Sequence, residues 1–282
     1  MTLMDTSAKV LSESSGLGQV TWSRFVFHTM WLTPFVIYWT RKRGERLFSS
    51  RRDILGHLIR GILIALSTAF YFAAIRENPI PDTVAVFFIS PMFAMILAAI
   101  FLGEKLRGRR ILAAVVAFIG VLVVLRPGGG NYTSDILLAP LAGLTFAGYI
   151  VATRASSMTG SPLVTAWGTS LAGVLVVLPW AIWDWQPLDT QTLGLMLLMG
   201  VFAASGHLCV SFSCRMASAS IVSIFHYSEI IAATFVSYLV FRHIPDSEVW
   251  FGFALIAGAK IVLTVLEYKE GRKPAQDSES KS

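Results

Sequence analysis

The chain has 282 residues, of which 55% are hydrophobic and 14% are charged, and its mean hydropathy is +0.65. A water-soluble domain of this length needs more charge to cover its surface, so the composition indicates a protein whose solvent is lipid. The net charge of +6 does not indicate a nucleic-acid partner, because the basic residues occupy short connections beside apolar segments.

Apolar runs of roughly membrane-spanning length predict nine full transmembrane helices. In chain order they are Val20–Thr40, Ile54–Ile75, Pro81–Phe101, Ile111–Leu125, Leu137–Thr153, Thr165–Trp183, Leu193–Phe212, Ile221–Phe241 and Val249–Glu267. Residues 1–12 are too short to span and lack the features of a signal peptide, so we interpret them as the end of a largely missing helix. Residues 268–282 are polar and charged, and this composition predicts a disordered cytoplasmic tail.

Lys and Arg residues cluster on alternate connections between these runs. Six lie between the first two runs and four more follow the third. The six are Arg41, Lys42, Arg43, Arg46, Arg51 and Arg52, and the four are Lys105, Arg107, Arg109 and Arg110. Because cytoplasmic loops hold the excess of Lys and Arg, the alternation predicts a multi-pass protein of the inner (plasma) membrane with a cytoplasmic C-terminus.

The two halves of the chain are related in sequence. An offset of 138 residues aligns Ser90 with Ser228, and an offset of 145 relates the earlier helices of the two halves. Residues 1–126 and 137–267 are therefore predicted to be two five-helix repeats, with the first helix of the first repeat truncated. Because each repeat has an odd number of helices, the two lie inverted relative to each other. We expect an all-α polytopic membrane protein of two inverted repeats.

One stretch carries the motifs of a known family. Ser90-Pro91 is followed by Phe101-Leu102-Gly103-Glu104-Lys105-Leu106, then by Arg109-Arg110, Gly120-Val121 and Leu125-Arg126-Pro127-Gly128. With these motifs the chain resembles the drug/metabolite transporter superfamily, specifically EamA-type permeases, and is similar to the group of S-adenosylmethionine and riboflavin importers. The resemblance implies ten helices in two inverted repeats and secondary transport of a small organic metabolite by alternating access. The second repeat departs from the pattern, since Phe241-Arg242-His243 stands where Phe-Gly-Glu is usual.

Ionisable side chains inside the predicted spans need a partner or a function, because each costs about 2.5–3.5 kcal/mol at the bilayer centre. Glu229 and Lys260 lie sixteen and fifteen residues from Pro245, the centre of the turn between them, so we expect them at similar depth. An interhelical ion pair and a substrate- or proton-binding role for Glu229 both remain open. His226 lies one turn before Glu229, and the two side chains together leave proton coupling open.

Arg24 is a further candidate in the first predicted span. Asp5 is expected at comparable depth across the first outer turn, so the two residues are predicted to form either a structural clamp or the edge of an anion-binding site. Aromatic side chains suit stacking on flat organic solutes, although Trp and Tyr also anchor helices at the membrane surface. The aromatic candidates for lining the substrate site are Tyr71, Tyr149, Trp167 and Tyr227.

Other classes of protein are disfavoured. Two cysteines, Cys209 and Cys214, are too few for a metal centre, and no cofactor is predicted. An intramembrane enzyme lacks its signature, because Gly168-Thr169-Ser170 is not followed by the second glycine of a nucleophile elbow. The main alternative is a non-transporting, degenerate relative that has lost its first helix. The expected partners are a small-molecule metabolite and the lipid bilayer, with the chain a monomer or homodimer, and the direction of transport remains open.

Overall fold

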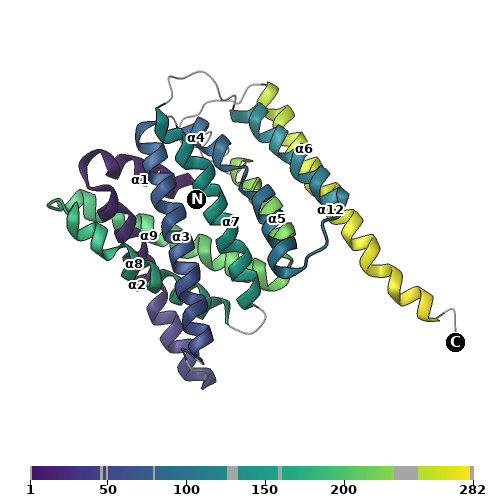
Figure 1. Ribbon diagram of the computed structural model, residues 1–282, viewed down its shortest axis with the longest axis horizontal. Coiled ribbons are helices and arrows are strands. Elements are labelled where there is room, and N and C mark those ends of the chain that lie inside the picture. The colour runs from purple at the N-terminus through teal and green to yellow at the C-terminus, as the bar shows by residue number, and fades with distance from the viewer. Residues whose placement is uncertain are drawn as a thin grey trace.

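The computed structural model describes residues 2–44, 47–48, 50–78, 80–125, 133–157, 161–231 and 247–279, and these contain helices and no strand (Figure 1). The helices are α1 (Thr2–Ser14), α2 (Leu17–Arg43), α3 (Arg51–Glu77), α4 (Ile80–Phe87), α5 (Ser90–Leu102), α6 (Gly108–Leu125), the 3-10 helix η1 (Ser134–Leu137), α7 (Leu138–Ser157), α8 (Pro162–Trp183), α9 (Thr190–Met216), α10 (Ala219–Phe225) and α12 (Ser247–Glu279).

Five stretches of the described chain are long and apolar enough to cross a membrane. They are Arg51–Glu77, Thr83–Leu102, Ser134–Ser156, Pro162–Trp183 and Thr190–Met216, and shorter apolar helices cover Ala219–Ile231 and Trp250–Leu266. The prediction of an all-helical protein with several apolar spans is thereby confirmed. The count of nine spans stays a prediction, because much of the predicted span Ile221–Phe241 lies outside the described residues.

The helix boundaries follow from local capping. Ser50 accepts the Asp53 N–H at the start of α3. Asp189 accepts the Thr192 N–H at the start of α9, and this hydrogen bond lowers the pKa of the Asp189 carboxyl. The helices α2 and α5 end at Gly44 and Gly103, whose φ values of 64° and 65° are left-handed and favour glycine.

Two carboxylates join the halves of the chain by capping helices of the opposite half. Asp184, after α8, accepts the N–H groups of Gly18 and Gln19 at 2.7 and 3.1 Å, at the start of α2. Glu104, after α5, accepts the N–H groups of Ala219 and Ser220 at 2.9 and 3.2 Å, at the start of α10. The Leu-Gly-Glu motif therefore has a structural role, since its carboxylate binds exposed donors at a helix N-terminus.

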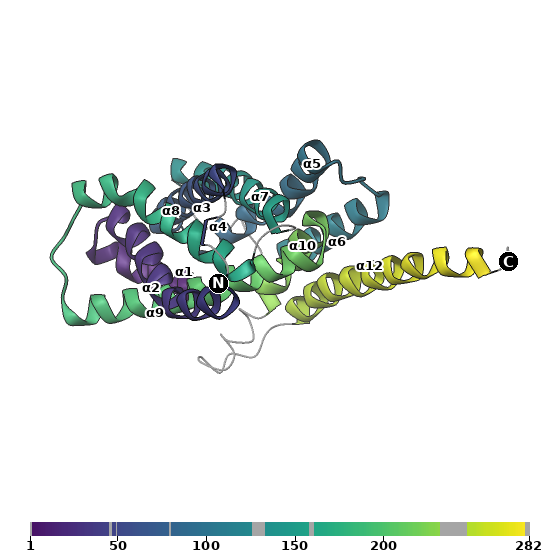
Figure 2. The same ribbon diagram turned by 90° about the horizontal axis from the view of Figure 1, so that it is seen from below.

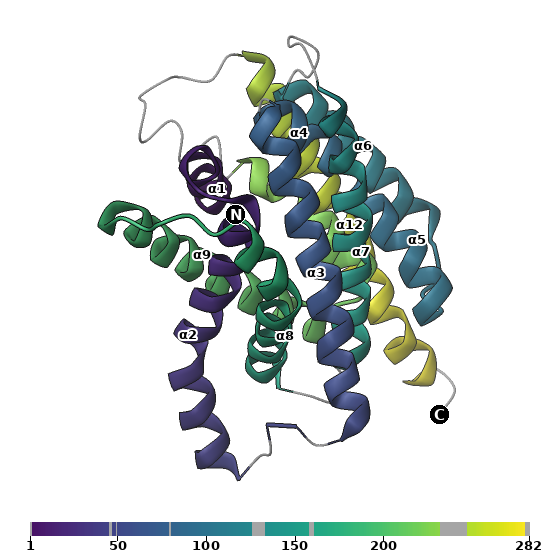
Figure 3. The same cartoon turned by 60° about the vertical axis from the view of Figure 1, so that its left-hand side comes forward.

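Helices of the two halves pack against each other in reciprocal pairs. The helix α2 packs on α8, and α6 packs on α12, which lie side by side in Figure 1. In addition, α2 packs on α9 while α3 packs on α8 (Figure 3). At the α6–α12 contact, a Cβ on Gly120 would lie 2.8 Å from the carbonyl oxygen of Gly252, so only glycine permits this close approach.

The helix α12 continues as far as Glu279, and its C-terminal end extends away from the other helices (Figures 1 and 2). The helix α12 therefore includes residues 268–279, and the disorder of the segment 268–282 stays a prediction.

Candidate functional site

A buried polar cluster at the meeting point of α2, α3, α7 and α9 is the candidate functional site. Arg24 of α2 is its centre, with 2% of the side chain exposed. The guanidinium donates to Thr68 Oγ1 of α3, and one Nη lies 2.5 Å from Nε2 of His207 of α9. The other ring nitrogen of His207, Nδ1, lies 2.9 Å from the hydroxyl of Tyr149 of α7. Four helices, two from each half, are thus joined through Arg24 and His207.

His28 completes this set of residues one helical turn after Arg24. Its ring stacks on the ring of His207, with centroids 5.4 Å apart and an interplanar angle of 24°. The side chain is buried, yet among the described residues neither ring nitrogen has a hydrogen-bond partner. Buried polar atoms without partners are costly, so these nitrogens are available to a bound solute. We call Arg24, His28, Thr68, Tyr149 and His207 the central cluster.

The buried charged side chains that the structure describes are positive. Three of the buried side chains that the structure describes are Lys or Arg (Arg24, Arg60 and Lys260), and none is a carboxylate. Charges act strongly on each other where water is excluded. The buried charges of the described residues therefore produce a positive potential around the central cluster.

The second predicted group, around His226, is connected to the central cluster through Phe146. The ring centroid of Phe146 lies 5.9 Å from that of Tyr149 and 5.1 Å from that of His226, to which the Phe146 ring is nearly perpendicular. His226 also lines a cavity of about 410 Å³ between α9 and α10. The structure therefore brings the predicted residues Tyr149 and His226 into one region.

Lys260 and Glu229 lie near His226, and both act on it electrostatically. Lys260 Nζ lies 3.5 Å from the carbonyl oxygen of Phe225 and 5.6 Å from the centre of its ring. Glu229 is half-buried in the helical turn after α10. These contacts bring the two residues to the same place, and a direct Glu229–Lys260 ion pair stays a prediction.

The remaining candidates lie in other surroundings. Tyr71 packs on Phe87, with ring centroids 5.1 Å apart, and Tyr227 packs on Phe88 at 5.8 Å, each within an apolar cluster. Trp167 donates its indole N–H to Thr33 Oγ1 at 2.9 Å. The side chain of Asp5 lies outside the described part of the chain, so its predicted pairing with Arg24 stays a prediction.

A second buried arginine was missed from the sequence. Arg60 of α3 donates to Ser156 Oγ and to Thr169 Oγ1, the latter at 3.2 Å, and its Nη lies 2.8 Å from His57 Nδ1. His28 and His207 are likewise absent from the predicted site residues. The available signal was the same that identified Arg24, namely a polar side chain far from either end of an apolar run.

Apolar spanning helices around a buried, positively charged polar cluster are typical of a membrane transporter. The chain belongs to the EamA-like transporter family, whose model matches residues 2–126 and 133–265. The predicted resemblance is therefore confirmed, and the protein is a multi-pass membrane transporter of a small metabolite.

Two relatives and one solved structure illustrate the similarity. The S-adenosylmethionine uptake transporter of Rickettsia conorii is 26% identical over 268 residues, covering 94% of this chain and 88% of its own. The riboflavin transporter of Vibrio cholerae is 28% identical over 223 residues, covering 77% and 74%. A solved crystal structure matches with a TM-score of 0.74 at 20% identity, covering 95% of this chain and 97% of its own, and this match supports the fold alone.

Proposed function

We propose that this protein is a secondary transporter that binds a small organic metabolite with an anionic group at the central cluster. The observation that carries the proposal is the buried Arg24–His207–Tyr149 network beside the two unpartnered nitrogens of His28. Arg24 supplies the positive charge for the anionic group, and His28 supplies further hydrogen bonds. The rings of Tyr149 and Phe146 supply flat apolar surfaces for the rest of the solute.

The relatives indicate the class of solute. Their names give S-adenosylmethionine and riboflavin, both of which contain a flat heteroaromatic ring system. The central cluster has the aromatic surfaces that suit such rings. A heteroaromatic metabolite with a carboxylate or phosphate is therefore the proposed substrate class, and the direction of transport is left to experiment.

Alternating access is the proposed mechanism, with the two halves of the chain as inverted repeats. The reciprocal packing of α2 on α9 and of α3 on α8 is the pattern expected of two such repeats. The central cluster takes Arg24 and Thr68 from the first half and Tyr149 and His207 from the second. Movement of one half against the other would therefore open this network and move its solute.

The charge topology predicts which arginine lies nearer each membrane surface. Arg24 lies seven residues into α2, about 10 Å from its predicted outer end. Arg60 lies nine residues into α3, about 14 Å from its predicted cytoplasmic end. We propose that the Arg60 contacts close the cytoplasmic side while the central cluster holds solute. The protein would lie in the inner membrane with its C-terminus in the cytoplasm.

The test compares metabolites in cells and in their medium. Cells express the unmodified protein, Arg24→Gln, Arg76→Gln or an empty vector, at matched levels in the membrane. Arg76 is the control, because it is an exposed arginine of α3 beside Glu77. We expect one compound to be redistributed by the unmodified protein and by Arg76→Gln only. Equal metabolite profiles in all four would favour the non-transporting alternative.

A further inference from the structure

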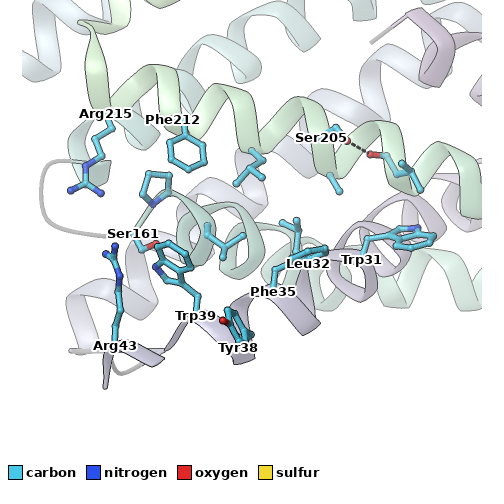
Figure 4. A pocket seen from close by; sticks show the side chains of 15 residues that line it. Trp31, Leu32, Phe35, Tyr38, Trp39, Arg43, Ser161, Ser205, Phe212 and Arg215 are labelled. Carbon is cyan, nitrogen blue, oxygen red and sulfur yellow. Dashed lines mark hydrogen bonds between the residues drawn. The ribbon is translucent and has the colours of Figure 1, made fainter. Parts of the chain in front are cut away.

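A lateral groove of about 660 Å³ lies between α2 and α9, with the start of α8 at one end (Figure 4). Its walls are largely aromatic and aliphatic. They include Trp31, Phe35, Tyr38 and Trp39 from α2 and Leu208 and Phe212 from α9. Phe35 and Tyr38 are each 63% exposed, so the groove faces outward from the helix bundle, toward lipid.

The groove has the length of one membrane leaflet. Trp31 marks one end, where its indole N–H donates to the carbonyl of Leu197 at 3.4 Å and joins α2 to α9. Arg43, the last residue of α2, marks the other end, twelve residues later. Twelve helical residues span about 18 Å, which is close to the ~15 Å of hydrocarbon in half a bilayer.

Positive charge is confined to the cytoplasmic end of the groove. Arg43 and Arg215 extend from facing helices at this end (Figure 4), and the described side chains that line the groove include no acidic residue. The Arg43 guanidinium lies 4.4 Å from the ring centre of Trp39, which holds it against the groove wall. Two guanidinium groups at headgroup depth complement a phosphate, and basic pockets between helices bind acidic headgroups.

We propose that this groove binds one phospholipid with an anionic headgroup from the cytoplasmic leaflet. The phosphate lies between Arg43 and Arg215, and an acyl chain follows Phe35 and Leu208 toward Trp31. None of these residues belongs to the central cluster, so the site is separate from the proposed substrate site and does not depend on it.

The test measures which lipid remains on the protein. The whole chain is placed in nanodiscs made of equal parts phosphatidylethanolamine and phosphatidylglycerol. The protein is then released from the nanodiscs in the mass spectrometer, and the lipids that it retains are identified and counted from its mass. We expect one retained phosphatidylglycerol. The double variant Arg43→Gln/Arg215→Gln should reduce the preference for this lipid by about tenfold or more, since both guanidinium groups that contact the anionic headgroup directly are then lost.

Two further variants distinguish a specific lipid-binding groove from non-specific attraction of lipid to a basic surface. Arg51→Gln/Arg52→Gln removes two exposed cytoplasmic charges at the start of α3, outside the groove, and should leave the preference unchanged. Ser205→Trp fills the groove while both arginines remain, and should remove the retained lipid.

Equal retention of the two lipids by the unmodified chain would overturn the proposal. An equal loss in the Arg51/Arg52 control would also overturn it, because the effect would then belong to general surface charge. A dimer mass that only the groove variants abolish would assign the groove to a second copy of the chain instead.

Discussion

Replacing Arg24 with glutamine tests the central cluster, because it removes the guanidinium charge and keeps a hydrogen-bonding side chain. In the structure Arg24 is 2% exposed and contacts Thr68 and His207. A hydrogen bond to a charged group contributes about 1.5–3 kcal/mol, so losing the contact to a substrate anion should raise KM by about 10- to 150-fold.

The matched control is Thr68→Val, which removes one partner of Arg24 and leaves its charge in place. Thr68 is proposed to act on the solute only through Arg24, whose charge remains, so KM should rise less than in Arg24→Gln. The assay is initial uptake of the identified compound into proteoliposomes, at equal amounts of inserted protein. An unchanged KM in Arg24→Gln would refute the assignment of Arg24 to the substrate anion. A larger effect of Thr68→Val than of Arg24→Gln would indicate a packing role instead.

Three further predictions concern coupling and stability. Glu229→Gln should leave exchange of labelled for unlabelled compound intact but abolish uptake driven by a pH gradient, because an amide side chain does not bind and release a proton. Gradient-driven uptake that persists in this variant would exclude Glu229 as the proton carrier. Glu104→Gln should lower the midpoint of thermal unfolding in detergent, because loss of the charged cap of α10 reduces the free energy of unfolding by about 1–3 kcal/mol. Glu77→Gln, which replaces an exposed carboxylate, is the control and should leave the midpoint unchanged. Gly120→Ala should destabilise the protein by about 1–3 kcal/mol, because the added Cβ meets the carbonyl oxygen of Gly252. Gly108→Ala is the control in the same unfolding assay and should be nearly neutral, because its Cβ would meet open space.

The sequence predicts the fold class and part of the site. Hydropathy and the alternation of basic loops predict the apolar membrane helices, because a backbone segment in lipid must satisfy its own hydrogen bonds and does so as a helix. Arg24 was found because a charge in an apolar run is costly. The motif containing Glu104 identifies the family, but its capping of α10 depends on a contact between residues 115 apart, which no local pattern specifies.

The aromatic candidates show where sequence reasoning ends. Tyr149 contacts His207 in the central cluster, whereas Tyr71 and Tyr227 pack in apolar clusters. All three are tyrosines in apolar helices, so composition does not separate them. The difference is the direction in which each helix presents the residue, and this depends on packing against other helices. The position of Arg60 within an apolar run is visible in the sequence, but two of its partners come from α7 and α8 and are not.

Substrate protection of a cysteine at position 28 tests most directly whether the solute occupies the central cluster. The native cysteines, exposed Cys209 and buried Cys214, are first replaced by alanine, and His28→Cys and a lipid-facing control, Leu66→Cys, are introduced separately. Labelling of purified protein with a small maleimide is then followed with and without saturating transported compound. We expect the compound to slow labelling at position 28 and to leave position 66 unaffected. Equal labelling at position 28 with and without the compound would contradict the assignment of the central cluster as the substrate site.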